Sequence, residues 1–246
     1  MSLLPVLAVR VLLVSRDIQI IEALCHFMES EAMHVEVCSD LSSAIRKLCH
    51  SKYDGVAIDF KEKPMAVELL AKIHETTAHR GAVVLGILED DHDMLSAFRA
   101  GTNFVLVRPL SPTIVSRTLR AAYPLMVREK RRYFRCPVTV PVSVSSNSNP
   151  DRLMATSANI SEGGMALKTQ VALQVGDKLR LSITLPGLEK EIKIMAEVCW
   201  SNNTGIAGVE FVRVPMTVKE ELQSWLSDRL LAALPERRPC PPMVSV

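Results

Sequence analysis

The spacing of apolar residues changes once along this chain, near residue 130, and that change constrains the fold more than any other feature. Before it, short continuous apolar runs alternate with segments that have helical spacing. After it, apolar residues recur at every second position. Because the two halves follow different periodicities and 246 residues are enough for two domains, we predict two domains of different class.

The first half has the pattern of a parallel sheet covered by helices on both faces. Val11–Val14 is a continuous apolar run, as a strand buried on both faces requires. Ile21, Leu24, Cys25 and Met28 then follow at helical spacing. The alternation continues through strands near 35–37, 56–58, 83–88 and 104–107, and through helices around 41–48, 69–73, 95–98 and 112–119. We therefore predict an α/β, doubly wound, parallel five-stranded sheet over residues 1–123.

A charged joint follows this sheet. Ser111 and Pro112 are typical of a helix N-cap and first helical position, so the last helix of this half is expected to begin there. Pro124 is expected to end or kink that helix, because proline removes a hydrogen bond inside it. Residues 124–135 are then a linker, and five of the last eight of these residues are basic.

The second half reads as a small all-β domain. Alternation begins at Val138, and polar turns containing Gly, Pro or Asn separate further runs near 154–160, 165–168, 178–185, 191–200 and 206–212. Thr217 and Glu220 have the spacing of a capping box and predict a closing helix. We expect a six-stranded antiparallel β-barrel with a C-terminal helix over residues 136–234. The tail, 235–246, contains four prolines and is predicted to be disordered.

Composition excludes several classes of protein. The net charge of +2 does not suit a polycation that coats nucleic acid. The six cysteines include no CxxC pair, so we expect buried thiols in a reducing compartment and no metal site. No apolar run reaches about 18 residues, so membrane insertion is not expected. The apolar start contains Arg10 and fits a strand better than a signal peptide, which predicts a cytoplasmic protein.

The first half resembles a response-regulator receiver domain. The resemblance rests on the first apolar run, on Asp54–Asp59, and on Ala100-Gly101 followed by Arg108-Pro109. It places Asp59 at the phospho-acceptor position, and we expect that position to be inactive. Ser15 and Arg16 stand where receivers carry an acidic pair for Mg²⁺, a metal that needs hard oxygen ligands.

Two further departures weaken the receiver chemistry. Gly86 and Ile87 provide no hydroxyl at the end of the fourth strand, and Arg108 replaces a lysine. The alternative role for Asp59 is to cap a loop, paired with Arg16 or Arg108. This half is then a degenerate receiver whose role is to contact other proteins or domains. The sequence leaves open whether its last helix forms a homodimer.

Two motifs in the second half suit an anionic nucleotide. Arg131 and Arg135 form an RxxxR whose guanidinium groups can grip phosphate and donate twice to guanine. Asn159, Ser161 and Gly164 form an NxSxxG at a turn, where Asn and Ser offer polar atoms and glycine permits close approach. Each motif alone is weak: a basic run is usually solvated, and such a turn is usually only a hairpin.

Together the two motifs resemble the signature of the PilZ domain family, a six-stranded barrel that binds the second messenger cyclic di-GMP. The resemblance extends from Arg128 to Leu234. It implies that Arg131 and Arg135 bind phosphate and guanine, and that Asn159, Ser161 and Gly164 complete the site. Because the arginines lie at the joint, ligand binding is expected to order this segment and alter contacts between the domains or with a downstream protein that the sequence does not identify.

The sequence bears on three other functions. An enzyme is not expected, because no GxSxG, HExxH or Walker motif occurs and every histidine lies at or before residue 92; no cofactor is expected either. Tyr133 and Phe134 could stack on the bases of a nucleic-acid polymer, but no recognition helix follows, and Phe134 is expected to be a core residue. The remaining alternative is an adaptor that binds no nucleotide and only contacts proteins.

Overall fold

The computed structural model describes residues 8–146 and 153–236. The chain divides into two compact units, and the second of them comprises Arg131–Ala232. The predicted disordered tail lies mostly outside the described residues. So does the predicted turn at 145–150, except that Ser145 and Ser146 belong to a strand.

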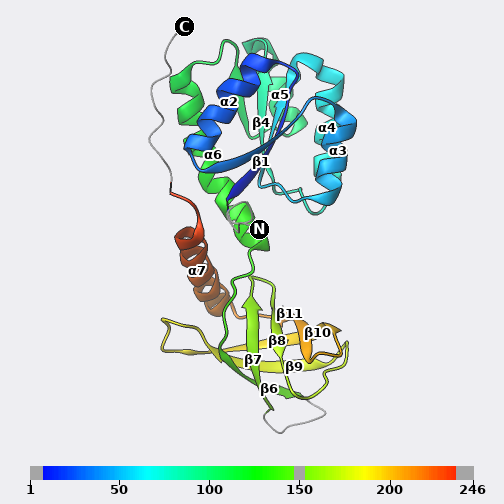
Figure 1. The fold of residues 1–246 in the computed structure, drawn as a ribbon, viewed down its shortest axis with the longest axis vertical. Helices are drawn as coiled ribbons and strands as arrows, with labels where there is room; N and C mark the ends of the chain where they lie inside the picture. The colour runs from blue at the N-terminus through cyan, green and yellow to red at the C-terminus, as the bar shows by residue number, and fades with distance from the viewer. Residues whose placement is uncertain (1–7, 147–152, 237–246) are drawn as a thin grey trace. The chain divides into compact units, whose positions relative to one another are not determined.

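The first unit is the predicted doubly wound sheet. Its five parallel strands have the order β2-β1-β3-β4-β5. Figure 1 shows this unit, with β1 and β4 labelled. In chain order the elements are β1 (Val9–Val14), α2 (Ile18–Ser30), β2 (Met33–Cys38), α3 (Leu41–His50), β3 (Gly55–Asp59), η1 (Phe60–Glu62), α4 (Lys63–Glu75), β4 (Val83–Leu88), η2 (Asp91–Asp93), α5 (Met94–Ala100), β5 (Phe104–Val107) and α6 (Pro112–Tyr133). This strand order brings the carboxyl ends of β1, β3 and β5 to one edge of the sheet, where ligand sites of such folds lie.

Two apolar cores cover the two faces of this sheet. Side chains from α2 and α6 pack on one face, and side chains from α3, α4 and α5 pack on the other. The strands contribute to both cores, since alternate residues point to opposite faces. This explains the continuous apolar runs that distinguish the first half of the sequence.

The prediction that α6 ends at Pro124 is wrong. The helix begins at Pro112 as predicted but continues through Pro124 to Tyr133. Pro124 is exposed, while Tyr123 and Met126 on either side are buried in the core beneath α2 and α6. Burial of these neighbours offsets the hydrogen bond that proline removes. Consequently Arg131 is helical and does not lie in a loop.

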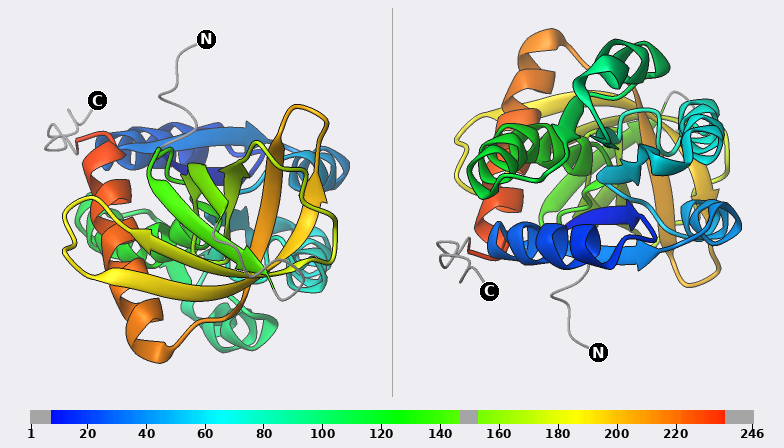
Figure 2. Two further views of the ribbon diagram at one scale, coloured as in Figure 1. Left: turned by 90° about the horizontal axis from the view of Figure 1, so that it is seen from below. Right: turned by 90° about the horizontal axis from the view of Figure 1, so that it is seen from above.

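The second unit is a closed antiparallel barrel with the strand order β10-β11-β8-β7-β6-β9. Figure 2 shows these strands together with the closing helix α7. The elements are β6 (Pro141–Ser146), β7 (Leu153–Ile160), β8 (Gly164–Lys168), β9 (Lys178–Thr184), β10 (Glu191–Ser201), β11 (Ile206–Arg213) and α7 (Met216–Ala233). In β9 and β10 alternate residues are buried, which confirms the period-two pattern for these strands.

Two details of this unit differ from the prediction. β6 begins at Pro141 and not at Val138. Before it, the Ser157 hydroxyl accepts from the Val140 amide at 3.0 Å and donates to the Val138 carbonyl at 2.6 Å, so a side chain replaces part of the backbone pairing. Helix α7 begins at Met216, so Thr217 lies inside the helix and does not cap it. Phe134 is buried, which confirms it as a core residue.

The cysteine prediction is partly wrong. Cys38 and Cys136 are buried, but Cys49 and Cys199 are exposed, and all the described cysteines are free thiols. Cys199 occupies an outward position on β10, where the alternation of the strand places it.

Candidate functional site

The two predicted motifs meet at one backbone bridge. Cys136 pairs with Ile160 in an antiparallel bridge, with amide-to-carbonyl distances of 2.8 and 2.9 Å. Arg135 immediately precedes one partner and Ser161 immediately follows the other, so they are opposite each other across the bridge. Arg135 is exposed, and Phe134 anchors the segment in the core. The structure therefore brings the end of RxxxR beside the NxSxxG turn.

Ser161 and Gly164 build this turn. Both the backbone amide and the hydroxyl of Ser161 donate to the Gly164 carbonyl, at 2.8 and 2.9 Å, and Ser161 is buried. A Cβ on Gly164 would lie 2.2 Å from the Val209 carbonyl oxygen, so β8 can approach β11 only if this residue is glycine. The amide of Phe211 donates to the Gly163 carbonyl at 2.8 Å and fixes the other side of the turn. Ser161 and Gly164 thus shape the patch.

The side-chain oxygen of Asn159, Oδ1, is buried and has no hydrogen-bond partner among the described residues. The strand pairing of β7 with β8 shifts register between Ser157 and Asn159, which indicates a bulge beside the motif. A buried acceptor without a partner is costly, and a ligand donor could satisfy it.

Arg131 is held by residues that the sequence did not point to. Its Nη1 atom donates to the Ser227 hydroxyl of α7 at 3.0 Å, and its Nε atom lies 3.7 Å from Oε2 of Glu162. Gln223 of α7 in turn donates to Oε1 of Glu162. Glu162 is one of the unspecified positions of NxSxxG, and Gln223 and Ser227 are distant in sequence, so no local pattern identified these contacts.

A cavity of about 410 Å³ adjoins the turn. Cations and apolar side chains dominate its wall, which consists of Arg132, Glu162, Gly163, Phe211, Val212, Val214 and Lys219. Arg132 belongs to the basic segment 128–135, which lies beside the Cys136–Ile160 bridge and also contributes to the wall of this cavity. The volume lies within the range of small-molecule pockets.

At the sheet edge of the first unit, Asp59 is engaged by neighbouring side chains. Its Oδ2 atom accepts from the Ser15 hydroxyl at 2.6 Å and from Arg108 at 2.9 Å, and its Oδ1 atom accepts from the Lys61 amide at 3.0 Å. Burial raises the pKa of this carboxyl, but the hydrogen bonds from Arg108, Ser15 and Lys61 outweigh burial and hold the pKa below its usual value. Asp59 therefore caps η1 and pairs with Arg108, whereas Arg16 pairs with Glu62 at 2.6 Å.

The same edge contains a cavity of about 250 Å³ beside Asp59. Arg108 also lies 3.5 Å from Asp17 and 3.1 Å from Glu89, so its guanidinium forms ion pairs with three carboxylates, including that of Asp59. Asp17 itself caps α2. Within residues 8–146 and 153–236, no three His, Cys, Asp or Glu side chains are grouped to hold a metal ion. Over the same ranges, none of the helices combines the length and hydropathy needed to cross a membrane.

The fold and the converging residues define the second unit as a small β-barrel with a basic segment and a glycine turn on one surface patch. Residues 129–228 match the family model described as PilZ domain, so this part of the chain is a PilZ domain. The PilZ family comprises cyclic di-GMP-binding effectors.

Solved structures match each half of the chain. The first half structurally matches CheY-like receivers, such as the chemotaxis response regulator CheY4 of Vibrio cholerae (20% identity, TM-score 0.43, 46% of this chain and 98% of that one). Two further solved structures match part of the chain. The PilZ domain of CeSA from a cellulose-synthesising bacterium has 21% identity, a TM-score of 0.30, and coverage of 41% and 97%. An inhibitor of motility from Bacillus subtilis has 23% identity, a TM-score of 0.35, and coverage of 40% of this chain and 50% of that one. No curated protein matches this chain in sequence.

Proposed function

We propose that the barrel binds cyclic di-GMP on the patch formed by Arg131, Arg135 and Asn159, with Ser161 and Gly164 shaping the turn. The observation that carries this proposal is the Cys136–Ile160 bridge, which puts Arg135 beside Ser161. The family of the barrel supports the choice of ligand. In this proposal the protein is a non-catalytic cytoplasmic signalling effector.

The chemistry of these groups fits a guanine dinucleotide. Arg135 is exposed, so its guanidinium can reach a phosphate or the O6 and N7 atoms of a guanine. The buried Oδ1 atom of Asn159 can accept from a guanine N–H group, which would satisfy it. Ser161 contributes through the shape of the turn, because its hydroxyl is already engaged with Gly164.

Binding would exchange the partners of Arg131. A ligand phosphate would take the guanidinium that Glu162 and Ser227 hold in the free protein. Because Gln223 and Ser227 lie on α7, this exchange would loosen the contacts of α7 with the turn. We propose that this change is passed on as altered contacts between the domains or with a downstream protein. The motion differs from the ordering of a loop, since Arg131 is already helical.

The first unit acts in this proposal through contacts and not through phosphoryl transfer. Asp59 is hydrogen-bonded by Ser15 and ion-paired with Arg108, and both occupy the carboxylate that would be phosphorylated. Phosphoryl transfer in proteins relies on metal ions to offset the developing charge.

An adaptor that binds no nucleotide is the second candidate function. The contacts of Arg131 with Glu162 and Ser227 favour it, because they would give the arginine a structural role in a barrel that never meets a ligand.

Calorimetry with cyclic di-GMP distinguishes the two candidates. Arg131→Ala and Arg135→Ala should each weaken binding by about ten- to a hundredfold, since a charged hydrogen bond contributes about 1.5–3 kcal/mol. Arg117→Ala, at an exposed position of α6 outside the patch, is the matched control and should bind as the wild type does. Absence of binding to the wild type favours the adaptor, and tight binding untouched by both patch variants removes the proposed site.

A further inference from the structure

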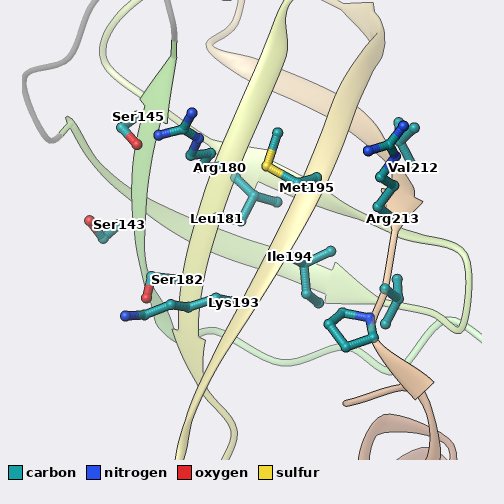
Figure 3. A pocket seen from close by; sticks show the side chains of 12 residues that line it. Ser143, Ser145, Arg180, Leu181, Ser182, Lys193, Ile194, Met195, Val212 and Arg213 are labelled. Atoms are coloured by element: carbon teal, nitrogen blue, oxygen red, sulfur yellow. The ribbon is translucent and has the colours of Figure 1, made fainter. Parts of the chain in front are cut away.

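A second, larger cavity lies on the outer wall of the barrel. It measures about 830 Å³ and is formed by β6, β9, β10 and the end of β11 (Figure 3). Its lining is Ser143, Ser145, Arg180, Leu181, Ser182, Lys193, Ile194, Met195, Val212, Arg213, Val214 and Pro215. None of the residues proposed to bind cyclic di-GMP belongs to it.

Strand register assembles the polar part of this cavity. Arg180 of β9 pairs with Met195 of β10 on one side and with Ser145 of β6 on the other, and Met195 pairs with Arg213 of β11. The next outward row joins Ser143, Ser182 and Lys193. Because paired residues point to the same face of a sheet, these side chains share one surface. Figure 3 shows Met195 between the two arginines, and Ser182 beside Lys193.

The charge of this surface favours an anion. The lining contains three cations, Arg180, Lys193 and Arg213, and no carboxylate belongs to the described residues that form it. Lys193 lies 3.6 Å from Glu191, but both side chains are largely exposed, so this ion pair is weak. Cations that line a concave site raise the local concentration of anions.

One hydroxyl points to a ligand independently of charge. The Oγ atom of Ser182 is buried and has no hydrogen-bond partner among the residues that the structure describes. A buried polar atom without a partner is uncommon and calls for an explanation. A phosphate oxygen beside Lys193 would accept from this hydroxyl and satisfy it.

The apolar part of the lining determines which anion fits. Met195, Val212 and Pro215 provide an apolar surface next to the cations, and the methionine sulfur packs well against aromatic rings. A cavity of about 830 Å³ is far larger than an inorganic phosphate needs and lies within the range of small-molecule sites. We propose that this cavity is a second ligand site that binds a nucleotide, with its phosphate near Arg213 and Lys193 and its base against Met195.

The test uses the full chain with methionine and isoleucine methyl groups labelled for NMR. Addition of GMP should shift the methyl signals of Met195 and Ile194 and leave that of Met126, in the core of the first unit, unchanged. Guanosine and inorganic phosphate, added separately, should each bind at least about tenfold more weakly than GMP. No shift at Met195 with millimolar GMP overturns the proposal. Inorganic phosphate that binds as well as GMP also overturns it, because the cavity is then only an anion patch.

Variants locate the site and separate this proposal from the first one. Arg213→Gln should weaken GMP binding by at least about tenfold, the effect of one lost charged hydrogen bond. Lys178→Gln, on β9 but outside the lining, makes the same charge change and should bind GMP like the wild type. Arg135→Ala should not affect GMP binding; loss of binding in this variant, or full binding by Arg213→Gln, would refute the cavity as the site.

Discussion

Replacement of Glu162 by glutamine should strengthen the binding of cyclic di-GMP. In the free protein the carboxylate of Glu162 lies 3.7 Å from Nε of Arg131, so it competes with a ligand phosphate for this guanidinium. Glutamine has the same shape and retains a polar group for Gln223, but it carries no charge. The substitution therefore removes the competition and leaves the turn in place.

The distance and the exposure of the two side chains set the expected magnitude. Two unit charges 3.7 Å apart interact by about 1 kcal/mol at the dielectric constant of water and by about 4.5 kcal/mol at an effective value of 20. The side chains of Arg131 and Glu162 are only 22% and 20% exposed, and the two facing atoms are buried, so the pair is screened less than an exposed one. Measured solvent-exposed pairs contribute about 1 kcal/mol or less, which sets the lower end for this pair. We therefore expect an affinity gain of at least about fivefold.

Calorimetry on the full chain measures this effect. Glu189→Gln, in the exposed turn between β9 and β10, makes the same change in net charge away from the patch and serves as the matched control. The gain should be confined to Glu162→Gln and should shrink as salt screens the charges. An unchanged or weaker affinity in Glu162→Gln would show that Glu162 does not compete with the ligand, and the proposed exchange of partners would be wrong.

Three further predictions concern the framework of the two units. Gly164→Ala should lower the free energy of unfolding of the barrel, measured in urea, by about 1–3 kcal/mol, because the new Cβ would meet the Val209 carbonyl. Gly163→Ala is the control and should change this free energy little, since the space around Gly163 is open. Equal stabilities of the two variants would contradict this reasoning. Acetyl phosphate with Mg²⁺ should leave Asp59 unmodified by mass spectrometry, and stoichiometric phosphorylation there would overturn the role given to Arg108. Burial alone would raise the pKa of Glu36, but hydrogen bonds from Lys47, Arg10 and Tyr53 lower it from 4.5 to about 2. The stability that Glu36 contributes is therefore fully present above pH 4.5 and is lost as the pH falls toward 2. The free energy of unfolding, followed by circular dichroism, should be higher for the wild type than for Glu36→Gln, and this difference should shrink as the pH falls across that window. A difference that does not depend on pH would refute the role of Glu36.

The architecture could be read from the sequence because both units obey simple periodicities. The continuous apolar run of β1 and the alternation along β9 follow directly from burial on two faces or on one face of a sheet. Helix α6 shows the limit of such reasoning. A local rule ends a helix at proline, but burial of Tyr123 and Met126 keeps this one intact, and burial is a property of the folded chain.

The candidate site was predictable only in its local parts. The positions of Arg135 and Ser161 follow from motif and strand order, and the bridge between Cys136 and Ile160 brings them together. The contacts of Arg131 with α7 depend on a helix almost one hundred residues later, so no spacing in the sequence contains them. The outer cavity has the same origin, because strand register and not sequence proximity gathers Arg180, Lys193 and Arg213.

A crystal structure of the full chain with cyclic di-GMP tests the central claim most directly. We expect the dinucleotide to lie against Arg135 and the turn that begins at Asn159, with Arg131 turned from Glu162 toward a phosphate. A dinucleotide bound elsewhere, for example against Arg213 and Lys193 on the outer wall of the barrel, would contradict the proposed site.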